Sequence, residues 1–312
     1  MPERPSDDDS PAPGSSDLGS PDLGRGRCSL PEGLVLVSTP IGNLGDMTSR
    51  ARAVLEAADL VLCEDTRTTA RLCAAFGIHA RLRALHEHNE EQSLPRLLAL
   101  LGAGRRLALV SDAGTPLLSD PGYRLVRAAI AAGLPVGAVP GANAALTALV
   151  LSGLPPHPFL FLGFPPPRAA ARQAAFAQLR GIERAGLSAS LIWHEAPHRL
   201  ADTLADLAAT FGPRPAAVAR ELTKRFEEVR RGTLTDLAAH YAESPPRGEV
   251  TLVVGPAPAE TASAVDLDAE LGAALEVHRL KDAVALVAAS TGLPRRAVYA
   301  HALALRAKDT EA

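Results

Sequence analysis

Short apolar runs alternate with amphipathic stretches from Gly33 to about Leu151. The runs are continuous, as is typical of strands that are buried on both faces of a parallel sheet. Strands are predicted at Leu34–Ser38, Leu60–Glu64, Arg81–Leu85, Arg106–Ser111 and Pro135–Val139. Helices are predicted between and after them at Thr48–Ala58, Thr68–Phe76, Gln92–Leu101, Tyr123–Ala132 and Ala142–Leu151. The pattern therefore predicts an α/β domain over residues 33–153, with a parallel sheet covered by helices.

A second set of strands and helices follows the proline-rich segment Ser152–Pro158, which we interpret as a linker. Its strands are predicted at Phe159–Phe164, Ser188–Glu195, Ala216–Arg220, Glu227–Gly232 and Glu249–Gly255. Its helices are predicted near Arg168–Arg184, Arg199–Phe211 and Thr235–Tyr241. Because no helix is predicted between the third and fourth strands of this set, these two strands are expected to pair antiparallel. The pattern therefore predicts a second α/β domain, with a mixed sheet, over residues 157–256.

Both ends of the chain differ from these two domains. Residues 1–32 are rich in Pro, Ser, Gly and Asp, which is typical of a disordered tail, and they lack the basic and apolar regions of a secretion signal. Pro256–Ser263 is predicted to be another linker. Residues 264–312 have a helical pattern, which LPRR at Leu293–Arg296 breaks into two parts. We interpret this region as a small helical cap, with a helix-turn-helix as the alternative.

Charge and cysteine content limit the classes of protein to which the chain can belong. The chain has 312 residues and is 47% hydrophobic, without an apolar run long enough to cross a membrane. Its net charge is -3; the seven acids and three arginines of residues 1–32 contribute -4, which leaves about +1 for the rest. This excludes a strongly basic nucleic-acid-binding domain but allows local arginine patches. Cys28, Cys63 and Cys73 form no CxxC pair, and so sparse a count is typical of the reducing cytoplasm.

Ligands of parallel α/β sheets bind at the carboxyl ends of the strands, so the segments there are candidate sites. Ser38–Asp46 follows the first strand and contains glycines, but not in the G-x-G-x-x-G pattern of dinucleotide-binding proteins, and Pro40 removes a backbone donor. The chain also has no G-x-x-x-x-G-K-[ST] loop. An ordinary dinucleotide site and a nucleoside triphosphate site are both disfavoured.

Polar side chains follow the second and third strands. Glu64–Arg67 (EDTR) can bind the polar groups of a ligand; equally, Asp65 or Thr66 can cap a helix while Glu64 forms an ion pair. His86–Glu90 (HEHNE) contains two histidines, but no Cys or His lies at metal-ligand spacing from them. We interpret it as a substrate-facing polar loop or a plain surface loop, and we predict no metal site.

Two glycine-containing segments follow the fourth and fifth strands. Val110–Gly122 (VSDAGTPLLSDPG) contains two glycines and two prolines and only two charged residues. We interpret it as a rigid loop whose backbone lies against a ligand. Pro140–Ala145 (PGANAA) turns the fifth strand into a helix whose free N-terminal amides can meet a ligand. His194–His198 (HEAPH) matches the zinc-protease pattern H-E-x-x-H, but Pro197 disfavours the helix which that chemistry needs. We expect a strand before Pro197 and a helix beginning there.

Several segments occur in the order typical of one family. They are TPIGNLGDMT, EDTR, LHEHNE, SDAGTPLLSDPG, PGANAALTAL, GFPP, HEAPHRL, ARELTK and GEVTLVV. On these segments the chain resembles the ribosomal RNA small-subunit methyltransferase I family, within the tetrapyrrole methylase superfamily of S-adenosylmethionine enzymes. The resemblance runs from about Gly33 to Val254, and more loosely into the C-terminal helical region. Asn143 and His194 depart from the family pattern, which usually has a small residue and an aromatic residue there.

The resemblance implies two α/β domains with the methyl donor, S-adenosylmethionine, bound in the cleft between them. It implies methylation of the ribose 2′-hydroxyl of a cytidine in the decoding centre of small-subunit ribosomal RNA, on the assembled subunit, by a cytoplasmic homodimer. It implies neither a metal nor a membrane. The donor is expected to contact Pro40, Asp112, Ala113, Gly114, Thr115, Ala142, Asn143 and Thr147.

The chemistry suggests roles for further residues. A ribose hydroxyl is a poor nucleophile, so a base should accept its proton. The candidates for this base are Glu64, Asp65 and His86. The candidates for holding phosphates or the RNA base are Arg67, Asn89, Arg199 and Lys224. Docking onto the subunit is expected to involve arginines such as Arg199, Arg225, Arg295 and Arg296.

Two rival functions stay open. A relative that methylates carbon on a tetrapyrrole would need a roomy, apolar cleft rather than the polar segments EDTR and LHEHNE. A non-catalytic RNA-binding module that merely kept the fold would not bind the methyl donor. Titration with S-adenosylmethionine distinguishes this second rival from an enzyme.

Overall fold

The computed structural model describes residues 31–257, 264–291 and 294–311. The predicted tail therefore lies outside the described residues except for its last two positions, and most of the predicted linker Pro256–Ser263 lies outside them as well. The chain divides into two compact units. Unit 1 extends to Gly141 without Ile41–Leu44, and unit 2 consists of Ile41–Leu44 and the chain from Ala142 onward.

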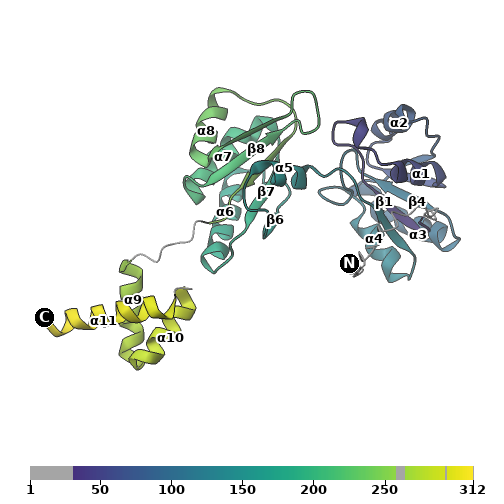
Figure 1. Ribbon diagram of the computed structural model, residues 1–312. Coiled ribbons are helices and arrows are strands. Elements are labelled where there is room, and N and C mark those ends of the chain that lie inside the picture. The colour runs from purple at the N-terminus through teal and green to yellow at the C-terminus, as the bar shows by residue number, and fades with distance from the viewer. Residues whose placement is uncertain (1–30, 258–263, 292–293, 312) are drawn as a thin grey trace, which may run out of the picture. The chain divides into compact units, whose positions relative to one another are not determined.

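Unit 1 contains a five-stranded parallel sheet with the strand order β3-β2-β4-β1-β5 (Figure 1). The strands are β1 (Leu34–Val37), β2 (Leu60–Cys63), β3 (Leu82–Ala84), β4 (Leu107–Val110) and β5 (Val136–Val139). In the interior strand β1, Leu34 pairs with Leu107 of β4 on one side and with Val136 of β5 on the other. The predicted parallel sheet is confirmed.

Helices cover both faces of this sheet. Side chains of a strand alternate between the two faces, and the apolar runs place buried residues on both. The helices are α1 (Ser49–Ala57), α2 (Thr66–Ala75), α3 (Glu87–Gly102) and α4 (Tyr123–Ala131). Helices α1 and α2 pack on the face that includes Val35 and Val37. Helices α3 and α4 pack on the opposite face, where Leu34 and Leu107 are buried. A leucine buried to this extent contributes about 2 kcal/mol, so the continuous apolar runs hold both layers together.

Unit 2 contains a mixed sheet with the order β6-β7-β10-β8-β9. The strands are β6 (Phe159–Phe161), β7 (Ser190–Glu195), β8 (Pro215–Arg220), β9 (Glu228–Thr233) and β10 (Val250–Val254). Strands β6 and β7 are parallel, and the other neighbours, including β8 with β9 as predicted, are antiparallel. The mixed sheet expected from the missing helix is therefore confirmed.

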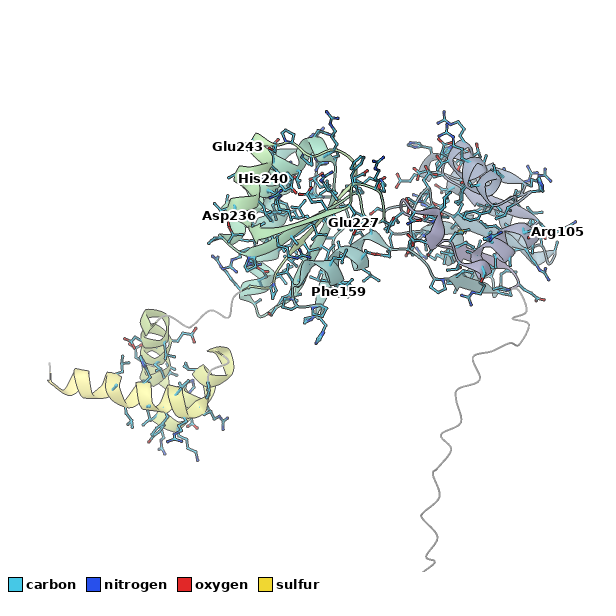
Figure 2. The ribbon with its side chains drawn as sticks, turned by 45° about the horizontal axis from the view of Figure 1, so that its top comes forward. Arg105, Phe159, Glu227, Asp236, His240 and Glu243 are labelled. Atoms are coloured by element: carbon cyan, nitrogen blue, oxygen red, sulfur yellow. The ribbon has the colours of Figure 1, made fainter. Side chains whose placement is uncertain are left out.

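Three helices pack on one face of the unit 2 sheet and a fourth packs on the other. The three are α6 (Ala169–Arg184), α7 (Leu200–Phe211) and α8 (Leu234–Glu243). Their core includes Phe176 and Trp193, and the polar residues Asp236, His240 and Glu243 line the outer side of α8 (Figure 2). On the other face, α5 (Ala144–Ser152) packs against Ile192. The predicted domain boundary at residue 153 falls just after α5, whereas this division falls before it, at Gly141.

The C-terminal helices form a small core of their own. They are α9 (Ala264–Val277), α10 (Leu280–Thr291) and α11 (Arg295–Glu311). Leu271, Val287 and Val298 are buried where they meet. The break near Leu293–Arg296 was predicted, whereas the break between α9 and α10 was not. In the part of the chain that the structure describes, no helix combines the length and the apolar character needed to cross a membrane.

Candidate functional site

The carboxyl ends of the parallel strands of unit 1 meet at one edge of the sheet, where the loops after β1 and β4 are joined. Thr39 and Gly114 exchange two backbone hydrogen bonds, of 2.9 and 3.0 Å. The Thr39 hydroxyl donates to the carbonyl oxygen of Ser111 over 3.3 Å. Gly114 has a φ of +82°, in the left-handed region that favours glycine. The glycine therefore allows the loop after β4 to turn back along the end of β1.

The loop after β4 is held in an uncommon backbone conformation. The Ser111 hydroxyl donates to the carbonyl oxygens of Ala113 and Gly114, at 3.2 and 3.1 Å. Leu117 and Ser119 have φ values of 74° and 70°, which cost residues with a side chain about 1–3 kcal/mol each. Strain of this kind persists only where the surroundings fix the loop, and it clusters at functional sites. The hydrogen bonds from Ser111 are contacts of this kind, and the rigidity of the loop stays a prediction.

Three carboxylates gather at the same edge. Asp112 accepts a hydrogen bond through Oδ1 from the backbone N–H of Asp65 over 3.1 Å. Partial burial and the charge of Asp112 raise the pKa of Glu64 above its ordinary value. Burial, together with the charges of Glu64 and Asp112, raises the pKa of Asp120 to about 6. Asp120 is not among the predicted site residues, because only the folded loop brings it near the other two acids.

Asp65 and Arg67 are engaged with each other. The Arg67 guanidinium lies 2.6 Å from Oδ2 of Asp65, and the Arg67 backbone N–H donates to Oδ1 over 2.8 Å. These interactions lower the pKa of Asp65 to about 2. Asp65 is the N-cap residue of α2, so helix capping, one of the two interpretations considered for this acid, is present. A carboxylate with so low a pKa is a weak base.

The segment His86–Glu90 is the start of α3, not a loop. The Asn89 side chain accepts a hydrogen bond from the backbone N–H of His86 over 2.9 Å and donates to the carbonyl oxygen of Ala84 over 3.2 Å. Buried Glu90 accepts from the backbone N–H of Leu125 over 2.9 Å. The helix therefore begins at Glu87 rather than at Gln92, and Asn89, predicted to hold RNA, serves as part of its N-terminal cap.

Three of the predicted donor contacts lie at the start of α5, in unit 2. Asn143 is the N-cap residue, and its side chain accepts from the backbone N–H of Leu146 over 3.0 Å. The Thr147 hydroxyl donates to the carbonyl oxygen of Asn143 over 2.7 Å. Ala142 directly precedes the cap. The other predicted contacts, from Pro40 and from Asp112 to Thr115, belong to unit 1.

Arg199 and Lys224, the predicted RNA contacts of unit 2, both pair with carboxylates of that unit. Arg199 lies 3.2 Å from Oε1 of buried Glu195 and donates to the carbonyl oxygen of Pro165 over 2.7 Å. Lys224 lies 2.8 Å from Glu221 and 3.0 Å from Glu249. Any role in RNA binding would require these cations to share or exchange their partners.

The HEAPH segment has the geometry expected from Pro197. His194 and Glu195 end strand β7, and a short 3-10 helix, η2 (Pro197–Arg199), follows. Burial lowers the pKa of His194, whose Nδ1 lies 3.1 Å from the Thr251 hydroxyl. Among the described residues, no three side chains of His, Cys, Asp or Glu gather at metal-binding distances.

Comparison with known proteins adds family relationships to this geometry. The family model of tetrapyrrole (corrin/porphyrin) methylases matches residues 33–238. A second model, described as the RsmI C-terminal HTH domain, matches residues 261–306, in agreement with the helix-turn-helix alternative.

Several curated relatives are named ribosomal RNA small subunit methyltransferase I. The relative from Mesorhizobium japonicum is 46% identical over 90% of this chain and 94% of its own. The relative from Micromonospora olivasterospora is 49% identical over 85% of each chain. The relative from Escherichia coli O157:H7 is 44% identical over 86% of this chain and 94% of its own.

Solved structures share the fold. The methyltransferase CobJ superimposes with a TM-score of 0.54 at 18% identity, over 72% of this chain and 94% of that one. Diphthine synthase superimposes with a TM-score of 0.53 at 16% identity, over 71% of this chain and 89% of that one. At such identities the superposition supports the architecture and not a shared substrate.

Proposed function

Because the chain belongs to the tetrapyrrole methylase family and, within it, to the ribosomal RNA small subunit methyltransferases I, we propose that this methyltransferase methylates the 2′-hydroxyl of a cytidine in the decoding centre of small-subunit ribosomal RNA. The observation that carries the proposal is identity of 46% along nearly the whole length of a relative with that name. The methyl donor is S-adenosylmethionine, which supplies a methyl group activated by its sulfonium. The names of the relatives support methylation of small-subunit ribosomal RNA, and the ribose position and the decoding centre are proposed beyond them.

The loop from Asp112 to Thr115 is proposed to contact the donor. Gly114 has no side chain, so a ligand can approach the backbone closely. Only Oδ1 of Asp112 is engaged, by the backbone N–H of Asp65; among the described residues, no hydrogen bond occupies Oδ2. A carboxylate oxygen in this position suits the ammonium or the hydroxyl groups of the donor. Pro40, Ala142, Asn143 and Thr147 stay as predicted contacts.

Glu64 is proposed as the base. The ribose oxygen attacks the methyl carbon, the carbon–sulfur bond breaks as the carbon–oxygen bond forms, and the hydroxyl proton passes to Glu64. The raised pKa of Glu64 makes it a better proton acceptor than Asp65, whose pKa is about 2. His86 is the second candidate because it follows the adjacent strand β3 at the same edge. Alignment of the reacting atoms supplies much of the remaining rate.

The assembled small subunit is proposed as the substrate. The chain outside its acidic tail carries a charge of about +1, too little for tight binding to free RNA through bulk electrostatics alone. A shaped subunit surface can supply the missing contacts. A ribosomal substrate implies that the enzyme acts in the cytoplasm, and a homodimer is the expected assembly.

Mass spectrometry of ribosomal RNA nucleosides tests the reaction. A strain that lacks the gene should lose one 2′-O-methylated cytidine from its small-subunit RNA, and the chain should restore it. In vitro, radiolabelled methyl groups should enter purified small subunits from that strain faster than they enter protein-free RNA. An unchanged nucleoside profile, or failure to bind S-adenosylmethionine in a calorimetric titration, would contradict the proposal.

A further inference from the structure

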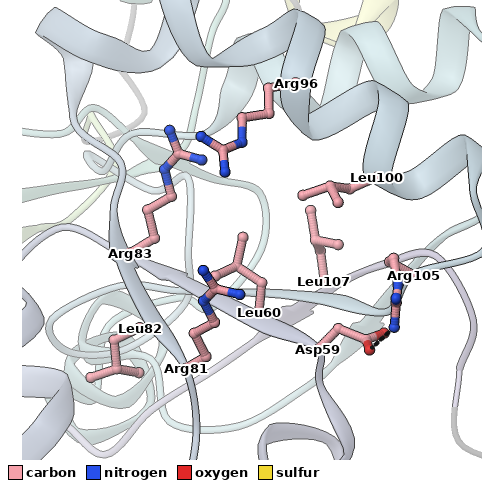
Figure 3. Close-up of a pocket in the computed structure, with 9 residues that line it drawn as sticks. All are labelled: Asp59, Leu60, Arg81, Leu82, Arg83, Arg96, Leu100, Arg105 and Leu107. Carbon is pink, nitrogen blue, oxygen red and sulfur yellow. Dashed lines mark hydrogen bonds and ion pairs between the residues drawn. The ribbon is translucent and has the colours of Figure 1, made fainter.

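A pocket lined by arginines lies at the other edge of the unit 1 sheet, at the amino ends of β2, β3 and β4. Its volume is about 470 Å³. Arg81, Arg83, Arg96 and Arg105 line it, and leucines such as Leu60 form its apolar wall (Figure 3). Arg81 and Arg83 come from the region of β3, whereas Arg96 comes from α3. The pocket is therefore assembled only when the helix packs on the sheet.

The pocket has an excess of positive charge. Arg105 is neutralised by Asp59, whose Oδ1 lies 3.0 Å from its guanidinium. Among the described residues, no hydrogen bond or ion pair engages the guanidinium groups of Arg81, Arg83 and Arg96. Figure 3 shows the side chains of Arg83 and Arg96 pointing toward each other. Like charges that converge in this way repel each other unless an anion lies between them.

The pocket is separate from the candidate donor site. It adjoins the first residues of β2 and β4, whereas Glu64 and Asp112 follow the last residues of these strands. Each of these strands has four residues, which at about 3.3 Å per residue places the two edges roughly 10 Å or more apart. A ligand of the pocket therefore does not compete with the methyl donor, and only an extended ligand can reach both.

The chemistry of the pocket favours phosphate. A planar guanidinium donates two parallel hydrogen bonds to a phosphate, and several converging arginines suit successive phosphates of a nucleic acid. The exposed side chains of Arg81 and Arg96 leave the pocket accessible to a polymer. The excess charge is local, in a chain whose body carries only about +1.

We propose that Arg81, Arg83 and Arg96 bind phosphate groups of the ribosomal RNA backbone and so position the small subunit on unit 1. This inference rests on the proposed function for the identity of the RNA. It adds a contact surface on unit 1, distinct from the residues that are proposed to bind the donor or accept the proton.

The test compares two double variants of the full chain with the same change in charge. Arg83→Glu with Arg96→Glu reverses the charge of two of the three unpaired pocket arginines, and Arg71→Glu with Arg127→Glu reverses exposed arginines on α2 and α4. Co-sedimentation measures the Kd for small subunits, and filter binding measures the Kd for protein-free small-subunit RNA. The pocket variant should raise both Kd values about tenfold or more and lower the slope of log Kd against log salt by about 1–2, because each lost phosphate contact removes nearly one unit. The control should change each Kd less than about twofold.

A milder variant tests whether misfolding causes the loss of binding in the Glu variant. Arg83→Gln with Arg96→Gln should weaken RNA binding in the same direction while the Tm is unchanged or raised, because two unpaired like charges are removed. Affinity for S-adenosylmethionine should be the same in all variants.

Each alternative result has a definite meaning. Equal Kd values for the pocket and control variants overturn the pocket proposal, even if the wild type methylates subunits normally. A loss confined to subunits, with RNA binding intact, overturns it in favour of a ribosomal protein. A pocket-dependent thermal shift with inorganic pyrophosphate, without any change in RNA binding, overturns it in favour of a small free anion. Absence of methyl incorporation by the wild type contradicts the proposed function. The RNA-binding comparison between the pocket and control variants still tests whether the pocket binds RNA.

Discussion

The backbone N–H of Asp65 donates to Oδ1 of Asp112 over 3.1 Å and so joins the loops that follow β2 and β4. One carboxylate oxygen thus holds the loop after the neighbouring strand β2, and the other has no hydrogen-bond partner among the described residues. Asp112 links the segment proposed to contain the base with the segment proposed to contact the donor. Loss of this side chain should disturb both.

Asp112→Ala should weaken S-adenosylmethionine binding about tenfold or more, which corresponds to about 1.4 kcal/mol. It should also lower the free energy of unfolding by about 1 kcal/mol, because a hydrogen bond to a charged group is lost. Isothermal calorimetry and urea unfolding measure the two effects. Glu56→Ala, an exposed acid on α1, is the control and should change neither. Normal donor affinity in the Asp112 variant would remove this side chain from the site.

Glu64→Gln should lower kcat by about 100-fold or more while donor affinity is retained, because the proton acceptor is lost. Asp65→Ala should act mainly by removing the α2 cap, so it should lower the Tm and leave kcat nearly unchanged. Single-turnover methyl transfer and thermal unfolding separate the two effects. A larger loss of kcat in the Asp65 variant would reverse the assignment of the base.

Glu87→Gln is a finer probe of the same assignment. The charge of Glu87 contributes to the raised pKa of Glu64. Its removal should therefore move the acidic limb of the pH–rate profile to lower pH and leave the maximal rate nearly unchanged. No movement of this limb would argue that Glu64 is not the group that accepts the proton.

Asp120 should make the protein less stable as the pH rises from about 4 to about 6. Its pKa is about 6 in the folded protein, against an ordinary value of 3.8. Between these values the folded state binds more protons than the unfolded state, so unfolding becomes easier with rising pH, and the effect levels off above pH 6. In Asp120→Asn this contribution should vanish, so the Tm near pH 7 should rise by about 2 °C or more. Parallel pH dependence in both proteins would show that the carboxylate stays ionised.

Reversal of Arg295 and Arg296 to Glu should weaken binding to small subunits without changing donor affinity. Both side chains are exposed at the start of α11. Acidic residues at a helix N-terminus interact favourably with its dipole, by about 0.3–1 kcal/mol, so the helix should not unfold. Arg279→Glu with Lys281→Glu, at the start of α10, is the matched control. Co-sedimentation that is equally strong for both variants would reduce the C-terminal helices to a structural role.

The strands were predictable because their signal is local. Val35, Val37 and their neighbours form continuous apolar runs, and turn residues end each run. The start of α3 was missed because HEHNE is polar and Pro95 lies inside the helix. The cap made by Asn89 and the bond from Leu125 to Glu90 that hold this first turn are invisible without the fold.

The site was only partly predictable, since side-chain partners are often distant in the sequence. The distinctive segments after β2 and β4 identified a set of residues, but not that Asp65 is paired with Arg67 while no ion pair engages Glu64 among the described residues. Arg199 and Lys224 were expected to contact RNA, yet their partners at Pro165 and Glu249 come from other elements. The arginine pocket likewise joins residues of β3 and α3 whose proximity no motif signals.

The strand order of unit 1 has a consequence for synthesis of the chain. Strand β1 is made first, but Leu34 pairs with Leu107 and Val136, which leave the ribosome much later. Strands β1 and β2 therefore emerge before β4, the strand that separates them in the sheet. Parallel pairings over such distances form slowly, and unpaired apolar strands are prone to aggregation meanwhile. Nascent chains that end before Val139 should thus depend on chaperones, and unit 1 should become resistant to protease in one late step.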